Sequence, residues 1–339
     1  VSRAYYGYMR RLPVLIAASL GLVAAVGTAL GPANGVTASA TVVAVGDIAF
    51  ASDSPTAPQR KTAALATAIA PDRLLLIGDL AYGHKTLGAW QPTSVAEFQS
   101  KLLPSWGTLL HKSWLVPGNH ETYGSGKGVG YRWLVKSLKS YGMPQATKKG
   151  DLWWSRTITT GSKTWLVLGL DSEGLASASK RARETAFIAK TLSANPSKPT
   201  IVMWHRPRYT SGEHGNQTDV GVKALWNAVK SDKDVVLVLW GHDHDFESRA
   251  VNVTGRTRPL QTLVVGTGGA ELRSCPGYAD PVVTASLVCG SASDSFTNYG
   301  VVKLVLTATG YTWEYRQVGS GGTGTVAANG TARGTFSLS

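Results

Sequence analysis

The sequence predicts a layered α/β domain, because short apolar stretches alternate along the chain with amphipathic stretches of helical length. Of the 339 residues, 43% are hydrophobic, which is enough for a sizeable core. Buried strands are predicted at Thr41–Val45, Leu74–Ile77, Trp114–Val116, Trp165–Leu170, Thr200–Trp204, Val235–Trp240 and Thr262–Val265. Helices are predicted between them at Arg60–Ala70, Val95–Leu110, Tyr131–Ser140, Ser179–Ser193 and Val220–Lys230.

Two further strand pairs complete the predicted domain. Asp151–Thr160 and Lys163–Leu170 flank the turn residues Gly161-Ser162 and predict a hairpin. Gly300–Leu306 and Tyr311–Val318 predict a second pair around Thr309-Gly310. Residues 41–318 are therefore predicted to form one domain, and residues 319–339, rich in Gly, Ala and Thr, a loose C-terminal tail.

Residues 1–40 have the features of an export signal. Arg10 and Arg11 precede an apolar run from Leu12 to Leu30, and small residues follow as far as Ala38-Ser39-Ala40. We therefore expect cleavage near Ala40 and a secreted, extracellular protein that keeps no membrane attachment. An uncleaved anchor is the alternative, since the run is nearly long enough to span a bilayer. The paired arginines leave the twin-arginine route open beside the general secretory route.

Charge and cysteine content narrow the function classes. Lys and Arg number 34 against 21 Asp and Glu, so the net charge is +13, which attracts anions such as small phosphorylated substrates. The same excess also fits a role in solubility or adhesion to a cell wall. Basic runs with interleaved aromatic residues are missing, which argues against nucleic acid as the main partner. The two cysteines, Cys275 and Cys289, lie in a Gly/Pro/Ser-rich region and predict one structural disulfide.

Metal-ligand side chains follow five strands of one predicted sheet. The segments are Gly46-Asp47, Gly78-Asp79-Leu80-Ala81-Tyr82, Gly118-Asn119-His120-Glu121, His205-Arg206-Pro207 and Gly241-His242-Asp243-His244. The carboxyl ends of strands are where sites assemble in α/β sheets, and glycine lets the backbone approach a bound ion. Carboxylates, an amide, imidazoles and a phenol form a mixed oxygen and nitrogen set that suits first-row metals. Taken singly, most of these segments fit an ordinary turn or cap, but in Gly241-His242-Asp243-His244 the alternate residues place both imidazoles on one side of an extended segment. The joint occurrence of the five segments predicts a metal site.

The order of these segments resembles the calcineurin-like metallophosphoesterases, and more narrowly their purple acid phosphatase branch. The wider superfamily usually carries Asp-x-His after its first strand, whereas Asp47 is followed by Ile48, Ala49 and Phe50. The purple branch also lacks that histidine and carries Gly-Asp-x-x-Tyr, matched here by residues 78–82. The resemblance covers residues 41–318, which would be the catalytic domain, and implies a four-layer αββα sandwich with mixed sheets.

The resemblance further implies two adjacent metal ions. The first would be held by Asp47, Asp79, Tyr82 and His244, and the second by Asp79, Asn119, His205 and His242. Asp79 would bridge the two ions. A phenolate from Tyr82 favours Fe(III) in the first position, and the second would take Fe(II), Zn or Mn. The implied reaction is in-line attack on a phosphate ester by a hydroxide that the metals activate.

The resemblance implies that two further histidines are catalytic, and several neighbouring residues have candidate roles. His120 matches a family residue used for phosphate contact or proton transfer, and His214 lies near where plant relatives place a substrate-facing histidine, although an ordinary loop fits it equally well. Glu121 and Asp243 are expected to orient the ligand imidazoles. The remaining candidates are Arg206 and Arg208 as phosphate contacts or rim residues, Asp171 as a structural residue, and His84 and His111 without a role.

The function predicted from the sequence is a purple acid phosphatase-like phosphomonoesterase. A phosphodiesterase or nucleotide hydrolase of the same superfamily is the alternative within the same chemistry. An exported metal- or phosphate-binding protein without catalysis is the alternative from another class. The sequence gives no support for a loss of catalysis, because every implied ligand position is filled by a competent residue.

Overall fold

The computed structural model describes residues 38–123, 128–143, 151–275, 283–288, 299–319 and 333–338. Residues 36–339 form one compact unit. The apolar run of the predicted export signal lies outside the described residues, while Ser39 and Ala40 of the expected cleavage site begin the first strand. Within the described part of the chain, no helix has both the length and the apolar character needed to cross a membrane.

The described strands form two large mixed sheets and one small hairpin. The six-stranded sheet has the order β15 (Arg333–Ser337), β14 (Gly310–Gln317), β13 (Gly300–Thr307), β1 (Ser39–Val45), β2 (Arg73–Ile77) and β5 (Ser113–Val116). The seven-stranded sheet has the order β12 (Val283–Val288), β10 (Phe246–Val251), β11 (Leu260–Val265), β9 (Val235–Trp240), β8 (Thr200–Met203), β7 (Lys163–Gly169) and β6 (Trp154–Thr160). The small hairpin pairs β3 (Lys85–Thr86) with β4 (Ala89–Trp90).

The parallel strands of each sheet bring their carboxyl ends to a common edge. In the six-stranded sheet β1, β2 and β5 run parallel, while β13 pairs antiparallel with β1. In the seven-stranded sheet β7, β8, β9 and β11 run parallel, and antiparallel β6 and β10 lie beside β7 and β11. The loops that follow five of these parallel strands carry the predicted ligands.

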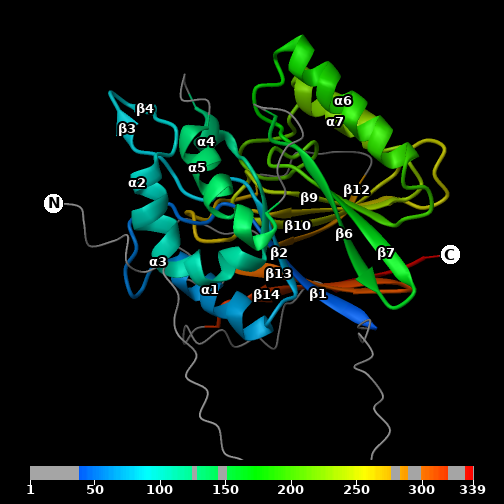
Figure 1. Ribbon diagram of the computed structural model, residues 1–339, viewed down its shortest axis with the longest axis horizontal. Coiled ribbons are helices and arrows are strands. Elements are labelled where there is room, and N and C mark those ends of the chain that lie inside the picture. The colour runs from blue at the N-terminus through cyan, green and yellow to red at the C-terminus, as the bar shows by residue number, and fades with distance from the viewer. Residues whose placement is uncertain are drawn as a thin grey trace, which may run out of the picture. The chain divides into compact units, whose positions relative to one another are not determined.

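Side chains that alternate across the strands build three apolar cores. Val42 and Ala44 of β1 point into the core between the two sheets, whereas Val43 and Val45 point to the outer face, as the two-residue period of a strand requires. The outer face of the six-stranded sheet packs under α1 (Pro58–Ile69), α3 (Leu103–Trp106) and α5 (Val129–Ser137). The outer face of the other sheet packs under α6 (Ala178–Ser193) and α7 (Val220–Val229). The layers are therefore helix, sheet, sheet and helix, with α6 and α7 at the upper right of Figure 1 and α1 and α3 at the left.

One predicted helix is broken into pieces. The segment expected as Val95–Leu110 contains α2 (Val95–Glu97), a π-helical turn at Phe98–Leu102, α3, and a 3-10 turn at Gly107–Lys112. Pro104 lies in this segment and has no backbone N–H, so an uninterrupted α-helical ladder cannot form there. The last short helix, α4 (Asn119–Thr122), and a 3-10 turn at Lys139–Tyr141 complete the described helical elements.

The C-terminal region differs from the prediction. Residues 320–332 of the predicted tail lie outside the described residues, but Arg333–Ser337 forms β15 and pairs antiparallel with β14, so this end extends the sheet. Cys275 is disulfide-bonded, and Cys289, the other cysteine of the chain, lies outside the described residues. The predicted two-residue hairpin turn between β6 and β7 is confirmed by the pairing of Thr160 with Lys163.

Candidate metal centre

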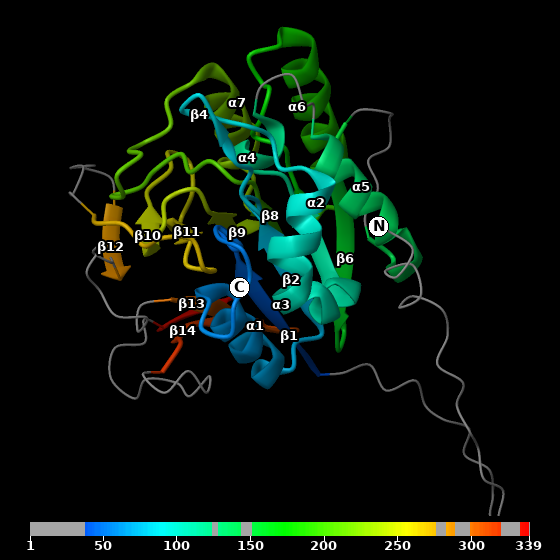
Figure 2. The same ribbon diagram turned by 90° about the vertical axis from the view of Figure 1, so that its left-hand side faces the viewer.

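The candidate site lies where the carboxyl ends of the two sheets meet. The prediction of one sheet is wrong: Asp47, Asp79 and Asn119 follow strands of the six-stranded sheet, and the predicted ligands His205, His242 and His244 follow strands of the seven-stranded sheet. The sheets are joined at this edge by a hydrogen bond from Gly46 N to Val265 O of 2.8 Å. Figure 2 shows β1 and β2 approaching β8 and β9 in the same region.

The backbone at three candidate ligands has an unusual conformation. Asp47, Asp79 and His242 have φ angles of 58°, 47° and 74°, in the left-handed region that side-chain-bearing residues rarely adopt. Such residues cost on the order of 1–3 kcal/mol each and cluster at functional sites. Of the four glycines that precede candidate ligands, only Gly78 has a positive φ. Gly118 instead allows Asp79 to lie close to the backbone, since a Cβ at Gly118 would lie 2.2 Å from Asp79 Oδ1.

Three predicted ligands of the first metal converge in a buried cluster. The Tyr82 hydroxyl donates to Asp47 Oδ1 at 3.1 Å and lies 2.9 Å from His244 Nε2. His244 Nε2 is also 3.5 Å from Asp47 Oδ1. The other ring nitrogen of His244 is fixed by Glu271 O at 2.6 Å, so Nε2 is the nitrogen directed at the cluster.

The predicted ligands of the second metal form a neighbouring cluster. His205 Nε2 lies 3.1 Å from Asn119 Oδ1 and 3.3 Å from Asp79 Oδ2, and its Nδ1 is held by Ile77 O at 2.9 Å. One potential ligand atom from each of Asp79, His205 and His242 lies within 4.8 Å of the others. The two clusters are connected, because His242 N donates to Asp47 Oδ2 at 2.9 Å.

The donor set fits bound cations. Asp47 and Asp79 are 0% and 1% exposed, and among the described residues only imidazoles form ion pairs with either carboxylate. Burial raises the pKa of Asp47 to about 8, and the carboxylate of Asp79 acts in the same direction. Burial and the charge of Asp47 raise the pKa of Tyr82 well above its usual value. Cations would replace protons at these crowded oxygens, since metal ligands must be deprotonated.

The imidazoles carry different charges in the metal-free protein. Burial disfavours the charged form of His205, but the carboxylates of Asp79 and Asp47 overcome it and raise its pKa to about 10. Burial and the positive charge of Arg273 lower the pKa of His244 to about 3. Burial also lowers the pKa of His242 well below its usual value, so His242 and His244 are neutral donors at pH 7.

His120 lies beside Asp79 in an aromatic enclosure. Its backbone N–H donates to Asp79 Oδ1 at 2.9 Å, while its Nε2 remains 3.9 Å from Asp79 Oδ2. Its ring centroid is 4.1 Å from that of Tyr82, 4.6 Å from Trp90 and 4.9 Å from Tyr123. Burial lowers its pKa to about 4. Trp90 and Tyr123 were not predicted as site residues. The hydroxyl of Tyr123 also accepts a hydrogen bond of 2.7 Å from Asn119 Nδ2.

His214 also reaches the site. Its ring centroid is 4.2 Å from that of His242 and 6.3 Å from that of His244. Asp243 Oδ1 lies 3.0 Å from His214 Nδ1, and Arg273 Nη1 lies 3.0 Å from Nε2. Arg273, in the loop after β11, was not recognised from the sequence, because no motif surrounds it.

The acidic neighbours act differently from the prediction. Glu121 contacts no ligand imidazole in its hydrogen bonds but accepts from the backbone N–H groups of Gly118, Asp79 and Leu80 at 2.7, 2.9 and 2.8 Å. Asp243 orients an imidazole, but it is that of His214 and not that of a predicted ligand. Glu121 therefore fixes the backbone of two ligand loops.

The remaining candidates are placed as follows. Arg206 Nη1 lies 3.2 Å from His242 Nε2, and its Nε donates to Glu173 at 2.9 Å. Arg208 lies over the ring of Tyr209. Asp171 accepts from Lys180 Nζ at 2.6 Å and from Glu173 N at 2.9 Å, which is a structural arrangement. His84 bonds to Glu97 and His111 to Thr108 O, so neither is part of the site.

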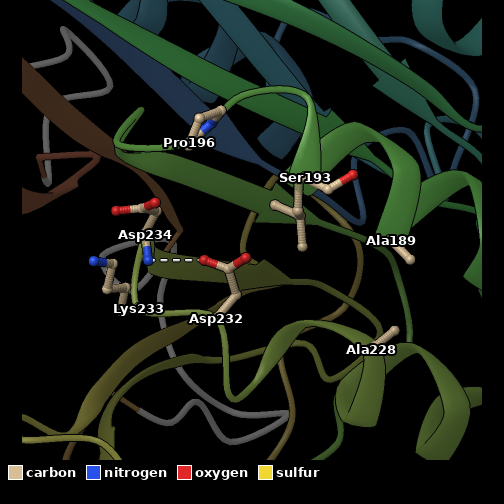
Figure 3. Close-up of a pocket in the computed structure, with 8 residues that line it drawn as sticks. Ala189, Ser193, Pro196, Ala228, Asp232, Lys233 and Asp234 are labelled. Carbon is tan, nitrogen blue, oxygen red and sulfur yellow. Dashed lines mark hydrogen bonds between the residues drawn. The ribbon is translucent and has the colours of Figure 1, made fainter.

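A depression in the surface lies away from this site. It is lined by the end of α6, by Ala228 of α7 and by Asp232, Lys233 and Asp234 (Figure 3). Asp234 N donates to Asp232 Oδ1 at 2.8 Å, and Asp234 Oδ2 accepts from Ser197 N at 2.8 Å. These carboxylates hold the local backbone, and the depression contains none of the candidate ligands.

A sequence model of the family described as calcineurin-like phosphoesterase matches residues 40–246, which is more than half of the chain. A search of curated protein sequences finds no match.

Solved structures share the fold at low sequence identity. A purple acid phosphatase from yellow lupin (Lupinus luteus) seeds aligns with a TM-score of 0.59 and 17% identity, over 89% of this chain and 54% of its own. GAP50, the anchor in the inner membrane complex of Plasmodium, aligns with a TM-score of 0.58 and 13% identity, over 88% of this chain and 89% of its own. A dimetal phosphatase from Danio rerio aligns with a TM-score of 0.52 and 11% identity, over 88% of this chain and 99% of its own. This likeness confirms the predicted sandwich, and it shows the fold alone.

Proposed function

Because the chain belongs to the calcineurin-like phosphoesterase family, a family of metal-dependent phosphoester hydrolases, we propose that it is a secreted phosphomonoesterase of the purple acid phosphatase type. The observation that carries the proposal is the convergence of two buried donor clusters, one containing a phenol, at the shared edge of two sheets. The sequence of residues 1–40 supports export, and residues 41–318 would form the catalytic domain.

The proposed ligands are those implied by the sequence. Asp47, Tyr82 and His244 would hold one ion, Asn119, His205 and His242 the other, and Asp79 would contact both. Two bound ions supply Lewis acidity that activates water and stabilises charge on the phosphoryl oxygens.

The chain's own groups position the substrate at this centre. His120 lies next to the ligand Asn119, and its aromatic neighbours Tyr82, Trp90 and Tyr123 restrict the orientation of its ring. We assign it to contact with the substrate phosphate or with the leaving oxygen, because its Nδ1 is buried without a hydrogen-bond partner among the described residues. The rings of Tyr82 and Trp90 also limit the access of water to this side of the site.

We expect the purified metal-loaded protein to hydrolyse p-nitrophenyl phosphate with a kcat/KM at least about tenfold above that for bis(p-nitrophenyl) phosphate. The physical reason is that a dianionic monoester matches the positive charge of two cations and nearby guanidinium groups better than a monoanionic diester. Release of p-nitrophenolate measures both reactions. Faster cleavage of the diester would identify a phosphodiesterase, and binding of phosphate without cleavage of either ester would identify a binding protein.

Tyr82→Phe tests the proposal that the first position holds Fe(III). The iron-loaded wild-type protein is expected to show a visible absorption band from phenolate-to-iron charge transfer, and the variant is expected to lose it because the oxygen donor is gone. Tyr123→Phe is the matched control, since Tyr123 bonds to Asn119 and not to the first cluster. A colourless wild-type protein with full iron content contradicts this ligand assignment.

A further inference from the structure

Two arginines stand at the ends of a row of side chains along the candidate site. Arg206 Nη1 lies 3.2 Å from His242 Nε2, the rings of His242 and His214 are 4.2 Å apart, and Arg273 Nη1 lies 3.0 Å from His214 Nε2. Arg206 is anchored by Glu173, whose two oxygens accept from its Nε at 2.9 and 3.1 Å. Arg273 is anchored through its backbone N–H, which donates to His244 O at 3.1 Å. Glu173 thus fixes the guanidinium of Arg206 beside the proposed ligand His242, while the guanidinium of Arg273 contacts His214.

The hydrogen-bond roles at His214 follow from its partners. A carboxylate only accepts and a guanidinium only donates, so the Nδ1 that faces Asp243 carries the proton and the Nε2 that faces Arg273 accepts. The atom that would donate to a substrate phosphate is therefore occupied by Arg273. In this arrangement His214 supports Arg273 and presents no N–H of its own to a phosphate.

The contact of Arg206 with His242 cannot persist when His242 binds a metal ion. If the ion takes Nε2, it displaces the guanidinium directly. If the ion takes Nδ1, the ring proton is on Nε2, which then becomes a donor and no longer accepts from Arg206. Arg206 Nη1 loses its acceptor in both cases, while Glu173 keeps the group in place. The guanidinium donor left in this position can take a phosphate oxygen as its acceptor.

The charge of Arg273 is also available to an anion. Within the described residues Arg273 forms no salt bridge, and the carboxylate of Glu213, on the loop that carries His214, accepts instead from Ser274 N and Oγ. Arg273 is only partly buried, so its guanidinium remains accessible from solvent.

Building on the proposed function, we propose that Arg206 and Arg273 form an oxyanion-binding wall of the site. They would hold the non-bridging oxygens of the substrate's phosphoryl group, and His214 is a positioning residue for Arg273 that does not touch the substrate. Guanidinium groups suit this task because their donors are fixed in a planar fork that matches phosphate oxygens.

Calorimetric titration of inorganic phosphate into the metal-loaded protein measures the affinity for phosphate, and so tests the oxyanion-binding wall independently of turnover. Arg273→Gln and Arg206→Gln are each expected to weaken phosphate binding about 10- to 100-fold, as expected for loss of a charged hydrogen bond, with two metal equivalents retained. Arg208→Gln is the matched control: it removes the same charge from a side chain that lies over Tyr209, and less than about a twofold change is expected.

A double-mutant cycle separates the roles of His214 and Arg273. If His214 acts only through Arg273, then His214→Ala weakens phosphate binding, adds nothing in the Arg273→Gln background, and leaves the pH profile of kcat unchanged. Full loss of phosphate binding in His214→Ala, with wild-type binding in Arg273→Gln, overturns the proposal. Failure of this proposal can be distinguished from failure of the proposed function. If the protein binds phosphate through both arginines but cleaves no ester, the oxyanion-binding wall is supported and the assignment as an enzyme is contradicted.

Discussion

Asp79→Ala is expected to lose at least one metal ion and to reduce turnover of phosphate esters on the order of 10³-fold or more. Asp79 is proposed as the one side chain that contacts both ions. Its Oδ2 lies 3.3 Å from His205 Nε2, and its Oδ1 accepts from His120 N at 2.9 Å, so truncation removes the carboxylate on which the second cluster converges. Metal analysis of the purified variant and steady-state kinetics measure the two effects.

His120→Ala is the matched control for this result. His120 is a neighbour of Asp79 but not a proposed ligand, since its Nε2 is 3.9 Å from Asp79 Oδ2 and its contact with Asp79 is made by the backbone. We expect this variant to keep both ions while its rate falls about 10²-fold or more, as for loss of a group that acts on the substrate. Normal metal content and near-normal turnover in Asp79→Ala contradict the ligand assignment, and loss of metal in His120→Ala contradicts the substrate-contact role.

The strands that were predicted from the sequence are those whose buried faces are almost entirely apolar. The central strands β1, β2 and β9 bury only apolar side chains and β8 adds one buried threonine, Thr200, and each was expected within a few residues of its bounds. β10 was missed because its buried positions include Glu247 and Arg249, which are paired with each other and so interrupt the apolar pattern. Ion pairing inside a sheet gives no periodic signal in a sequence.

The candidate site was predictable to the extent that it consists of residues next to strand ends. Local segments such as Gly241-His242-Asp243-His244 contain their own ligands and their own turn. Arg273 and Trp90 have no such local signal, because only the tertiary structure brings them to the imidazoles. Tyr123 lies only three residues after His120, but no motif marks it as part of the site. The meeting of two sheets could not be read from strand order alone, since Asp47 and His242 are separated by 195 residues in the chain.

Glu121→Ala is expected to destabilise the metal-free protein by on the order of 3–6 kcal/mol, the largest stability effect we predict for a single side chain. The Glu121 carboxylate is fully buried, with 0% exposure, and accepts from the backbone N–H groups of Gly118, Asp79 and Leu80. Removing it leaves three buried donors without acceptors, at a cost of about 1–3 kcal/mol each. The substitution also removes a hydrogen bond that holds the backbone of Asp79 in the unfavourable left-handed region, at a φ of 47°. Metal affinity is therefore expected to fall together with stability.

Denaturant unfolding of the metal-free variant measures this loss, and Glu97→Ala is the matched control. Glu97 also accepts from a backbone N–H, that of Ser94 at 2.8 Å, but it does so at the start of a surface helix where water can replace it. Loss of such a cap costs about 1 kcal/mol. If Glu121→Ala unfolds within about 1 kcal/mol of the wild-type protein, water or a neighbouring group satisfies the three N–H donors, and Glu121 does not hold the ligand loops.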